Sequence, residues 1–350
     1  MRLLDRFSRA GAVQLTGVLL ATVAVAACCV GVSSAAAPGV IRTIRVGYGA
    51  DAVSSDGTHV WVLSSAGVSE IKASNGTVIR TIHVGGLASA VSSDGTHVWV
   101  AGSAGVSEIK ASNGTVIRTI HVAGVGHGAV GVSSDGTHVW VTIGADNPDS
   151  AVSGTVSEID ASSGTVINTI KVGSYPDRVS SDGTHVWVTN SSVGIGVGGQ
   201  GSVSEIEASS GTVIRTILVG NDPGGISSDG TDVWVANVTG NTVSEIEAST
   251  GTVIRTIPVG TVGSLPNGVS SDGTHVWVTN YKSGGRTRNS TEGTVSEIES
   301  SSGTVIRTIP AGLLPLAVSS DGTHVWVANQ YIPERSKRFS HGAVSEIATS

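Results

Sequence analysis

The chain has 350 residues, a net charge of −7 and only two cysteines, and 48 of its residues are glycine. Charged residues make up 13% and aromatic residues 4%, which fits many short strands joined by tight turns and excludes a disordered chain. An acidic body disfavours nonspecific binding to nucleic acid and to anionic membranes, so we expect no nucleic acid as a partner.

Residues 1–36 are typical of an export signal. Three arginines lie within the first nine residues, an uncharged apolar run follows from Gly11 to Val32, and small residues then offer cleavage positions. We expect cleavage after Ala35 or Ala36 and a secreted or envelope-associated protein. The run is long enough to stay as a membrane anchor, and the segment ending at Cys28 resembles a lipobox. Any membrane contact is therefore expected through this segment alone.

The rest of the chain contains seven near copies of the unit Asp-Gly-Thr-His-Val-Trp-Val, each centred on a tryptophan. Successive tryptophans are 38 to 49 residues apart, which is the period of a four-stranded propeller blade. They are Trp61, Trp99, Trp140, Trp187, Trp234, Trp277 and Trp326.

The fourth copy shows how one blade is built. Its four strands, here named A to D, are predicted at Arg178–Ser181, Thr184–Thr189, Ser202–Ala208 and Thr212–Val219. Asp182-Gly183 predicts a two-residue type I′ turn between strands A and B, in which both residues have positive φ. Ser209-Ser210-Gly211 predicts a three-residue turn between strands C and D.

The chain begins and ends out of phase with this unit. Gly39–Val46 reads as a D strand with no blade before it, and Val344–Ile347 reads as a C strand with no D strand after it. We therefore predict an all-β fold in which residues 38–350 form a seven-bladed β-propeller. Its blades are four-stranded and antiparallel, and the N-terminal strand completes the last blade.

A charge pattern gives the register of strands C and D. A three-residue turn places the glutamate of strand C opposite the residue ten positions later, and ring closure places Glu346 opposite Arg42. The other predicted pairs are Glu70–Arg80, Glu108–Arg118, Glu158–Asn168, Glu205–Arg215, Glu245–Arg255 and Glu297–Arg307. We expect solvated pairs on the outer strands, worth roughly 0.2–1 kcal/mol each.

The runs His-Val-Trp-Val-Thr-Asn at 185–190 and 275–280 resemble the YVTN β-propeller repeat, with Trp where that family often has Tyr. Residues 242–254 resemble its strand C, turn and strand D, and the resemblance covers residues 38–350. It implies a secreted or surface-exposed seven-bladed propeller. Through related propellers it also implies a third possible role, a subunit that supports a redox partner.

The histidine of each unit is the first candidate for chemistry, because six of the seven copies carry one two residues before Trp. Asp232 replaces it in the fifth copy. Histidines spread at blade spacing are a packing pattern rather than a metal site, which needs three or four ligands around one ion. No phosphate-binding, zinc-protease, serine-hydrolase or thioredoxin-type motif is present, so we predict no cofactor and no metal.

Sequence variation is confined to the B–C and D–A loops, which open at the same end of a propeller, here called the loop face. Basic and aromatic residues gather in the loops of blades six and seven. These candidate binding residues are Tyr281, Lys282, Arg286, Arg288, Tyr331, Arg335, Lys337, Arg338 and Phe339. Exposed loops of this composition are also explained as solvated segments without a partner.

We predict an exported, noncatalytic and monomeric propeller whose loop face binds a protein or an anionic polymer or glycan of the cell envelope. The alternative is a lyase or hydrolase with its site at the mouth of the central channel. Its candidate groups are His127, Asp177, Asp222, Asn267 and His341.

Overall fold

The computed structural model describes residues 39–122, 126–145, 153–191, 199–261, 264–281, 292–331 and 341–349. They belong to one compact unit, Ala37–Ser350. These residues form strands and turns, and the described segments contain no helix with the length and apolar character to cross a membrane. The predicted export signal lies outside them, so its cleavage, anchoring or lipidation stays a prediction.

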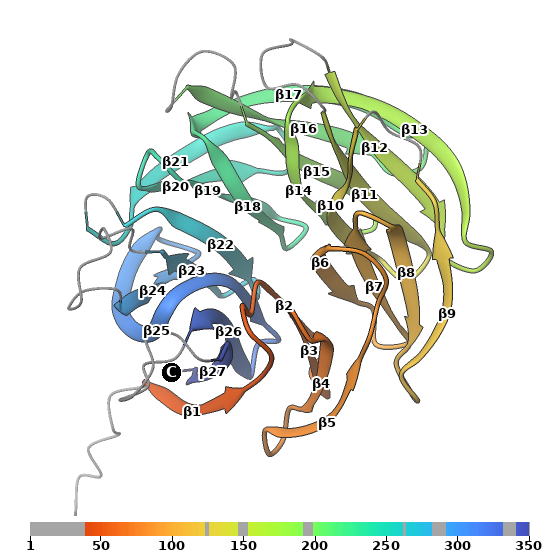
Figure 1. Cartoon of the computed structure of the whole chain (residues 1–350). Helices are drawn as coiled ribbons and strands as arrows, with labels where there is room; N and C mark the ends of the chain where they lie inside the picture. Colours follow the sequence, from red (N-terminus) through yellow and green to blue (C-terminus); the bar gives the residue numbers. More distant parts are fainter. Residues whose placement is uncertain are drawn as a thin grey trace, which may run out of the picture. The chain divides into compact units, whose positions relative to one another are not determined.

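The first four complete sheets in chain order are four-stranded and antiparallel (Figure 1). Blade one has β2 (Ala52–Ser55), β3 (His59–Ser64), β4 (Gly67–Lys72) and β5 (Thr77–Ile82). Blade two has β6 (Ala88–Ser93), β7 (His97–Gly102), β8 (Gly105–Lys110) and β9 (Thr115–Ile120). Blade three has β10 (Gly126–Ser134), β11 (His138–Ala145), β12 (Ser153–Asp160) and β13 (Thr165–Ser174). Blade four has β14 (Pro176–Ser181), β15 (His185–Asn190), β16 (Gln200–Glu207) and β17 (Thr212–Asn221).

Blade five is a separate four-stranded sheet, whereas blades six and seven share one long strand. Blade five has β18 (Pro223–Ser228), β19 (Asp232–Asn237), β20 (Thr242–Glu247) and β21 (Thr252–Pro258). Blade six has β22 (Pro266–Ser271), β23 (His275–Asn280), β24 (Glu292–Glu299) and the first part of β25 (Thr304–Ser320). Blade seven has the second part of β25, then β26 (His324–Tyr331), β27 (Ala343–Ala348) and β1 (Val40–Arg45). Because β25 serves as strand D of blade six and strand A of blade seven, these two blades form one seven-stranded sheet.

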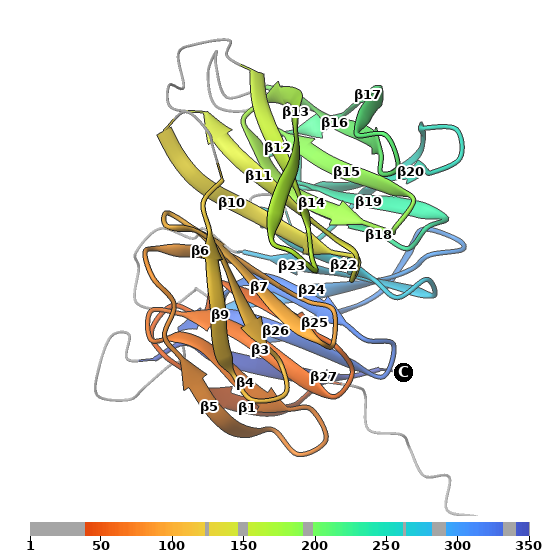
Figure 2. The ribbon, with the colours of Figure 1, turned by 90° about the vertical axis from the view of Figure 1, so that its right-hand side faces the viewer.

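The first strand of the chain closes the last blade. β1 pairs antiparallel with β27, and Arg42 lies opposite Glu346 in that pairing. The two strands lie side by side in Figures 1 and 2, although they come from opposite ends of the colour scale. The predicted all-β, seven-bladed propeller with an N-terminal closing strand is confirmed.

The blades form a closed ring with a separate apolar core at every junction. The innermost strands contact one another in the order β2, β6, β10, β14, β18, β22, β25 and again β2. Each tryptophan is fully buried and packs in the core between its own blade and the next. Trp140 of blade three, for example, packs with Val186 and Ile206 of blade four, and Trp326 packs with Val60 across the closing junction. Coverage of each blade on both faces explains the runs of buried residues in strands B and C, such as β3 and β4.

The repeated aspartate, rather than a type I′ turn, shapes the connection between strands A and B. In blade four Gly183 has a φ of 88° whereas Asp182 has no positive φ, so the type I′ prediction is wrong. Oδ1 of Asp182 accepts hydrogen bonds from the backbone N–H groups of Thr184 (3.0 Å) and His185 (2.8 Å), and Oδ2 accepts one from Trp187 Nε1 (3.2 Å). The carboxylate therefore satisfies the turn and orients the buried tryptophan together.

The two serines before this aspartate bond one blade to the next. The hydroxyl of Ser228 in blade five donates to Asp182 Oδ2 (2.9 Å), and its N–H donates to Ser180 Oγ (3.0 Å). The equivalent two bonds recur at all seven junctions. At the closing junction Ser55 makes them to blade seven. We call this set the serine–aspartate ring; it explains why Ser-Ser-Asp hardly varies.

The predicted glutamate register is confirmed in every blade, but the turn beside it is longer than predicted. Glu205 lies opposite Arg215, as expected, and Glu158 lies opposite Asn168. Four residues, 208–211, separate the paired Glu207 and Thr212. A bulge between Ile206 and Glu205 then restores the ten-residue offset, leaving Ile214 unpaired and exposed.

These glutamates are buried, so the prediction of solvated pairs is wrong. Their exposed fractions lie between 0% and 6%. Glu205 accepts a hydrogen bond from Arg215 Nη1 at 2.8 Å, and Arg215 Nη2 also donates to the carbonyl of Ser249 in the next blade. Burial raises the pKa of Glu205, and the Arg215 charge offsets part of that rise. The glutamate of the pair is thus buried, and its arginine partner also bonds the blade to its neighbour.

Candidate functional site

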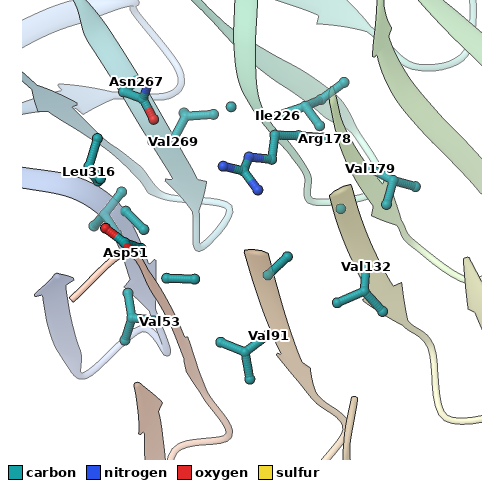
Figure 3. Close-up of a pocket in the computed structure, with 17 residues that line it drawn as sticks. Asp51, Val53, Val91, Val132, Arg178, Val179, Ile226, Asn267, Val269 and Leu316 are labelled. Atoms are coloured by element: carbon teal, nitrogen blue, oxygen red, sulfur yellow. The ribbon is translucent and has the colours of Figure 1, made fainter. Parts of the chain in front are cut away.

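A cavity of about 160 Å³ lies inside the ring of innermost strands (Figure 3). Each of the seven blades contributes two lining residues, those four and three positions before its Ser-Ser-Asp aspartate. Asp51, Asn267 and Leu316 line it from one position earlier. Because the D–A loops enter strand A from this side, the cavity lies in the half of the channel nearer the loop face.

Small residues line most of the cavity wall, and one large cation interrupts them. Four positions before the aspartate, six blades carry Ala or Gly, whereas blade four carries Arg178. The close approach of the next blade explains the glycines: a Cβ on Gly225 would lie 2.4 Å from the carbonyl oxygen of Asn267. Of the described lining residues, Arg178 alone is basic.

Arg178 reaches from blade four into the channel, as Figure 3 shows. Its backbone N–H donates to Thr189 Oγ1 (3.0 Å), and that hydroxyl donates to Gly224 O in blade five (3.0 Å). Its Nη1 donates to the carbonyls of Ser89 and Val130, both at 3.4 Å, and its Nε lies 3.7 Å from Asp177 Oδ1. These side-chain distances are at the long end for hydrogen bonds, so the guanidinium is held loosely on a firmly held backbone.

Asp51 places a carboxylate on the other side of the channel, in the segment that leads into blade one. Gln330 Nε2 donates to its Oδ1 at 3.0 Å. Burial raises the pKa of Asp51, while the Gln330 hydrogen bond and the positive charge of Arg178 act in the opposite direction. A half-buried acid and a half-buried base therefore share one small cavity.

The histidines of the repeat do not line this cavity, and each lies next to the buried glutamate of its own blade. His185 Nε2 is 3.8 Å from Glu205 Oε1, and its ring is tilted against Trp187 with centroids 6.0 Å apart. In blade five the replacing Asp232 has a raised pKa, first because of burial and then because of Asp229. Within the described segments no three His, Cys, Asp or Glu side chains come together as a metal-binding group.

The candidates for the channel mouth are only partly brought together. Asn267 lines the cavity, and Asp177 lies beside Arg178. Asp222 accepts a hydrogen bond from the Ser191 hydroxyl (3.2 Å), and the ring of His341 stacks on Tyr48 with centroids 5.2 Å apart; neither lines the cavity. His127 lies in β10, and its side chain is outside the described part.

Most of the basic loop candidates lie outside the described residues. These are Lys282, Arg286, Arg288, Arg335, Lys337, Arg338 and Phe339. Tyr281 directly follows β23, where its N–H donates to the carbonyl of Leu265 (3.1 Å), and Tyr331 ends β26. Both tyrosines are half-buried at the loop face.

Sequence reasoning missed Arg178 and Asp51. A signal for Arg178 was present, since it is the single departure from Ala or Gly at one position of seven aligned copies. The signal for Asp51 is weaker, because the position before that one carries six different residue types in the seven blades.

Comparisons with known proteins support the fold and go no further. Neither a protein-family model nor a curated protein sequence matches the chain. Among solved structures the chain is similar to the hydrazine synthase of Kuenenia stuttgartiensis, with a TM-score of 0.67 and 18% identity over 88% of this chain and 97% of that chain. Similarity at this identity shows a shared β-propeller-like architecture alone.

Proposed function

We propose that this protein is an exported, noncatalytic propeller of the YVTN type that binds an acidic protein or an anionic polymer or glycan of the cell envelope through its loop face. One observation carries the proposal: the two ends of the blades differ in kind. At the A–B turns every blade repeats the same serine–aspartate bonds, whereas the residues that vary lie at or near the loop face. Rigid scaffolds typically carry recognition on such variable loops.

The charge of the variable loops supports an anionic partner. The loops of blades six and seven contribute six Lys or Arg residues on a chain whose net charge is −7. A local basic surface on an acidic body favours specific attraction of anions over general adhesion.

Retention of the full chain on envelope fractions tests this proposal. The combined alanine variant of Arg286, Arg288, Arg335 and Arg338 should lose binding, and wild-type binding should weaken as salt rises. The matched control is Lys72→Ala with Lys110→Ala, because these exposed lysines end strand C beside the C–D turns, away from the loop face. Binding that is insensitive to salt and equal in both variants would sink the proposal.

A second candidate, a lyase or hydrolase at the channel mouth, is favoured by the cavity in which Arg178, Asp51 and Asn267 meet. A half-buried acid with a raised pKa in a cavity is a candidate group for proton transfer. Turnover of a substrate by the wild type, lost in Asp51→Asn, would favour this candidate over binding alone.

A further inference from the structure

The central cavity is lined by a cation, Arg178, and an acid, Asp51, whose backbones lie in different parts of the ring. Arg178 belongs to blade four and Asp51 to blade one, which are three blades apart in a ring of seven, the largest separation that such a ring allows. Arg178 lies closest to Asp177 of its own blade rather than to Asp51. The guanidinium reaches toward blades two and three, where Nη1 lies 3.4 Å from the carbonyls of Ser89 and Val130, and among the described residues it forms its ion pair with Asp177 rather than with Asp51.

Several polar groups around this space still have hydrogen-bonding capacity. Within the described part of the chain, Nη2 of Arg178 and the side-chain amide of Asn267 make no hydrogen bond, and Asp51 accepts one, from Gln330. A guanidinium offers five donors, and a carboxylate accepts several hydrogen bonds. The cavity can therefore donate hydrogen bonds from Arg178 and Asn267 and accept them at Asp51 and Asn267.

The size and the remaining walls fit a small molecule with a short apolar portion. About 160 Å³ is close to the volume that holds one benzene molecule in an engineered cavity of another protein. Between the polar groups the walls are made of Ala, Val, Ile and Leu side chains and glycine backbone.

Charge selects among small ligands. A simple anion that meets Arg178 also faces the carboxylates of Asp51 and Asp177, and a simple cation that meets Asp51 faces Arg178. A molecule that carries both charges can pair with Arg178 and with Asp51 at the same time. We propose that the central cavity binds a small aliphatic amino acid as its zwitterion, with the carboxylate on Arg178 and the ammonium group on Asp51.

Isothermal titration calorimetry of the full chain tests this with glycine, L-alanine and L-valine. Saturable binding of at least one amino acid is expected. The two half-ligands of valine, 3-methylbutanoate and 2-methylpropylamine, and the uncharged polyol glycerol should each bind at least about tenfold more weakly. No binding of any of the three amino acids, or equal binding of a half-ligand or of glycerol, overturns the proposal.

Variants then locate the site. Arg178→Ala and Asp51→Asn should each weaken amino-acid binding by about tenfold or more. Arg178→Ala places in blade four the residue that blades one, two and seven carry there, so its melting temperature should stay close to that of the wild type. Arg178→Gln, which keeps length but removes charge, serves if the alanine variant unfolds. Binding unchanged in both Arg178 and Asp51 variants contradicts the proposal.

This inference stands apart from envelope binding. Lys72→Ala and the four-arginine loop variant should keep amino-acid binding, and Arg178→Ala should keep envelope binding. Failure of one proposal is therefore distinguishable from failure of the other.

Discussion

The aspartate of each repeat accepts hydrogen bonds both from its own blade and from the next blade. Asp182 receives hydrogen bonds from its own turn, from the tryptophan of its own blade and from a serine of the next blade. The glutamate of strand C is its opposite in electrostatic terms. Hydrogen bonds lower the pKa of the aspartate, whereas burial raises that of Glu205. As the pH falls, protonation of Asp182 therefore removes stability, whereas protonation of Glu205 relieves the cost of a buried charge.

Asp182→Asn should lower the free energy of unfolding by about 1–3 kcal/mol near neutral pH, because the charge-assisted bonds are lost. Burial alone would raise the pKa of Asp182, but hydrogen bonds from Thr184, His185 and Ser228 lower it from 3.8 to about 2. Its contribution to stability is complete above the unfolded pKa of 3.8 and disappears as the pH falls to about 2. Urea unfolding at about pH 6 and about pH 2 measures this. A wild-type-to-variant difference that is equal at both pH values contradicts it.

At the scale of strands, the innermost strand of each blade is fitted to its neighbour by backbone contact. Gly225 meets the carbonyl of Asn267, and Gly131 meets that of Asp177 at 2.6 Å from an added Cβ. The glycines at this position therefore lie where the next blade comes closest, whereas blades one, two and seven carry alanine and Arg178 of blade four turns into the channel.

A matched pair of neighbouring glycines tests this fit. Gly225→Ala should destabilise the protein by about 1–3 kcal/mol, because the new Cβ meets backbone and forces the strands apart. At Gly224 the nearest atom is the side-chain Cγ2 of Val238 at 3.0 Å, so Gly224→Ala should cost less than about 1 kcal/mol. Neither glycine has positive φ, so backbone strain does not separate them. Denaturant unfolding that ranks the two variants in the reverse order contradicts the fit.

The elements were largely predictable and the candidate site was not. The tryptophan spacing and the Glu–Arg offset depend on contacts within one blade, which a repeated sequence displays seven times over. The cavity depends on which residues of seven separate strands lie around one axis. Asp51 and Arg178 line the same cavity only because the ring is closed. The A–B turn was mispredicted because Asp-Gly favours type I′ locally, whereas here the carboxylate bonds to the turn, to Trp187 and to the next blade.

For the whole molecule, blade seven differs from the other six blades because its two outer strands, β27 and β1, come from the two ends of the chain. Nε of Arg42 in β1 lies 2.5 Å from Oε2 of Glu346 in β27. The hydroxyl of Ser55 in blade one donates to Oδ2 of Asp321 in blade seven. The same residue types occupy these positions in the other blades, apart from Asn168 in place of the arginine in blade three, so closure by the chain ends uses no special chemistry.

A double-mutant cycle tests the closing pair. Glu346→Lys should lower stability because it places a like charge against Arg42 in a buried position, and adding Arg42→Glu should restore part of the loss. A coupling energy of about 0.5–3 kcal/mol is expected for residues in contact. The pair Glu245 and Arg255 is the matched control, because its two strands follow each other directly in the chain. Coupling in the control pair without coupling in the closing pair contradicts closure in this register.

The closing strand repeats the residues of the strands whose place it takes. Val-Ile-Arg-Thr-Ile occurs in β1 and again in strand D of blades one, two, four, five and six. The edge of β27 therefore selects β1 through its covalent tether and the high local concentration that the tether provides, rather than through a distinctive sequence. A free peptide of this sequence, or the first strand of another copy, presents the same groups to that edge. Blade seven is thus the position at which the ring can exchange a strand in trans.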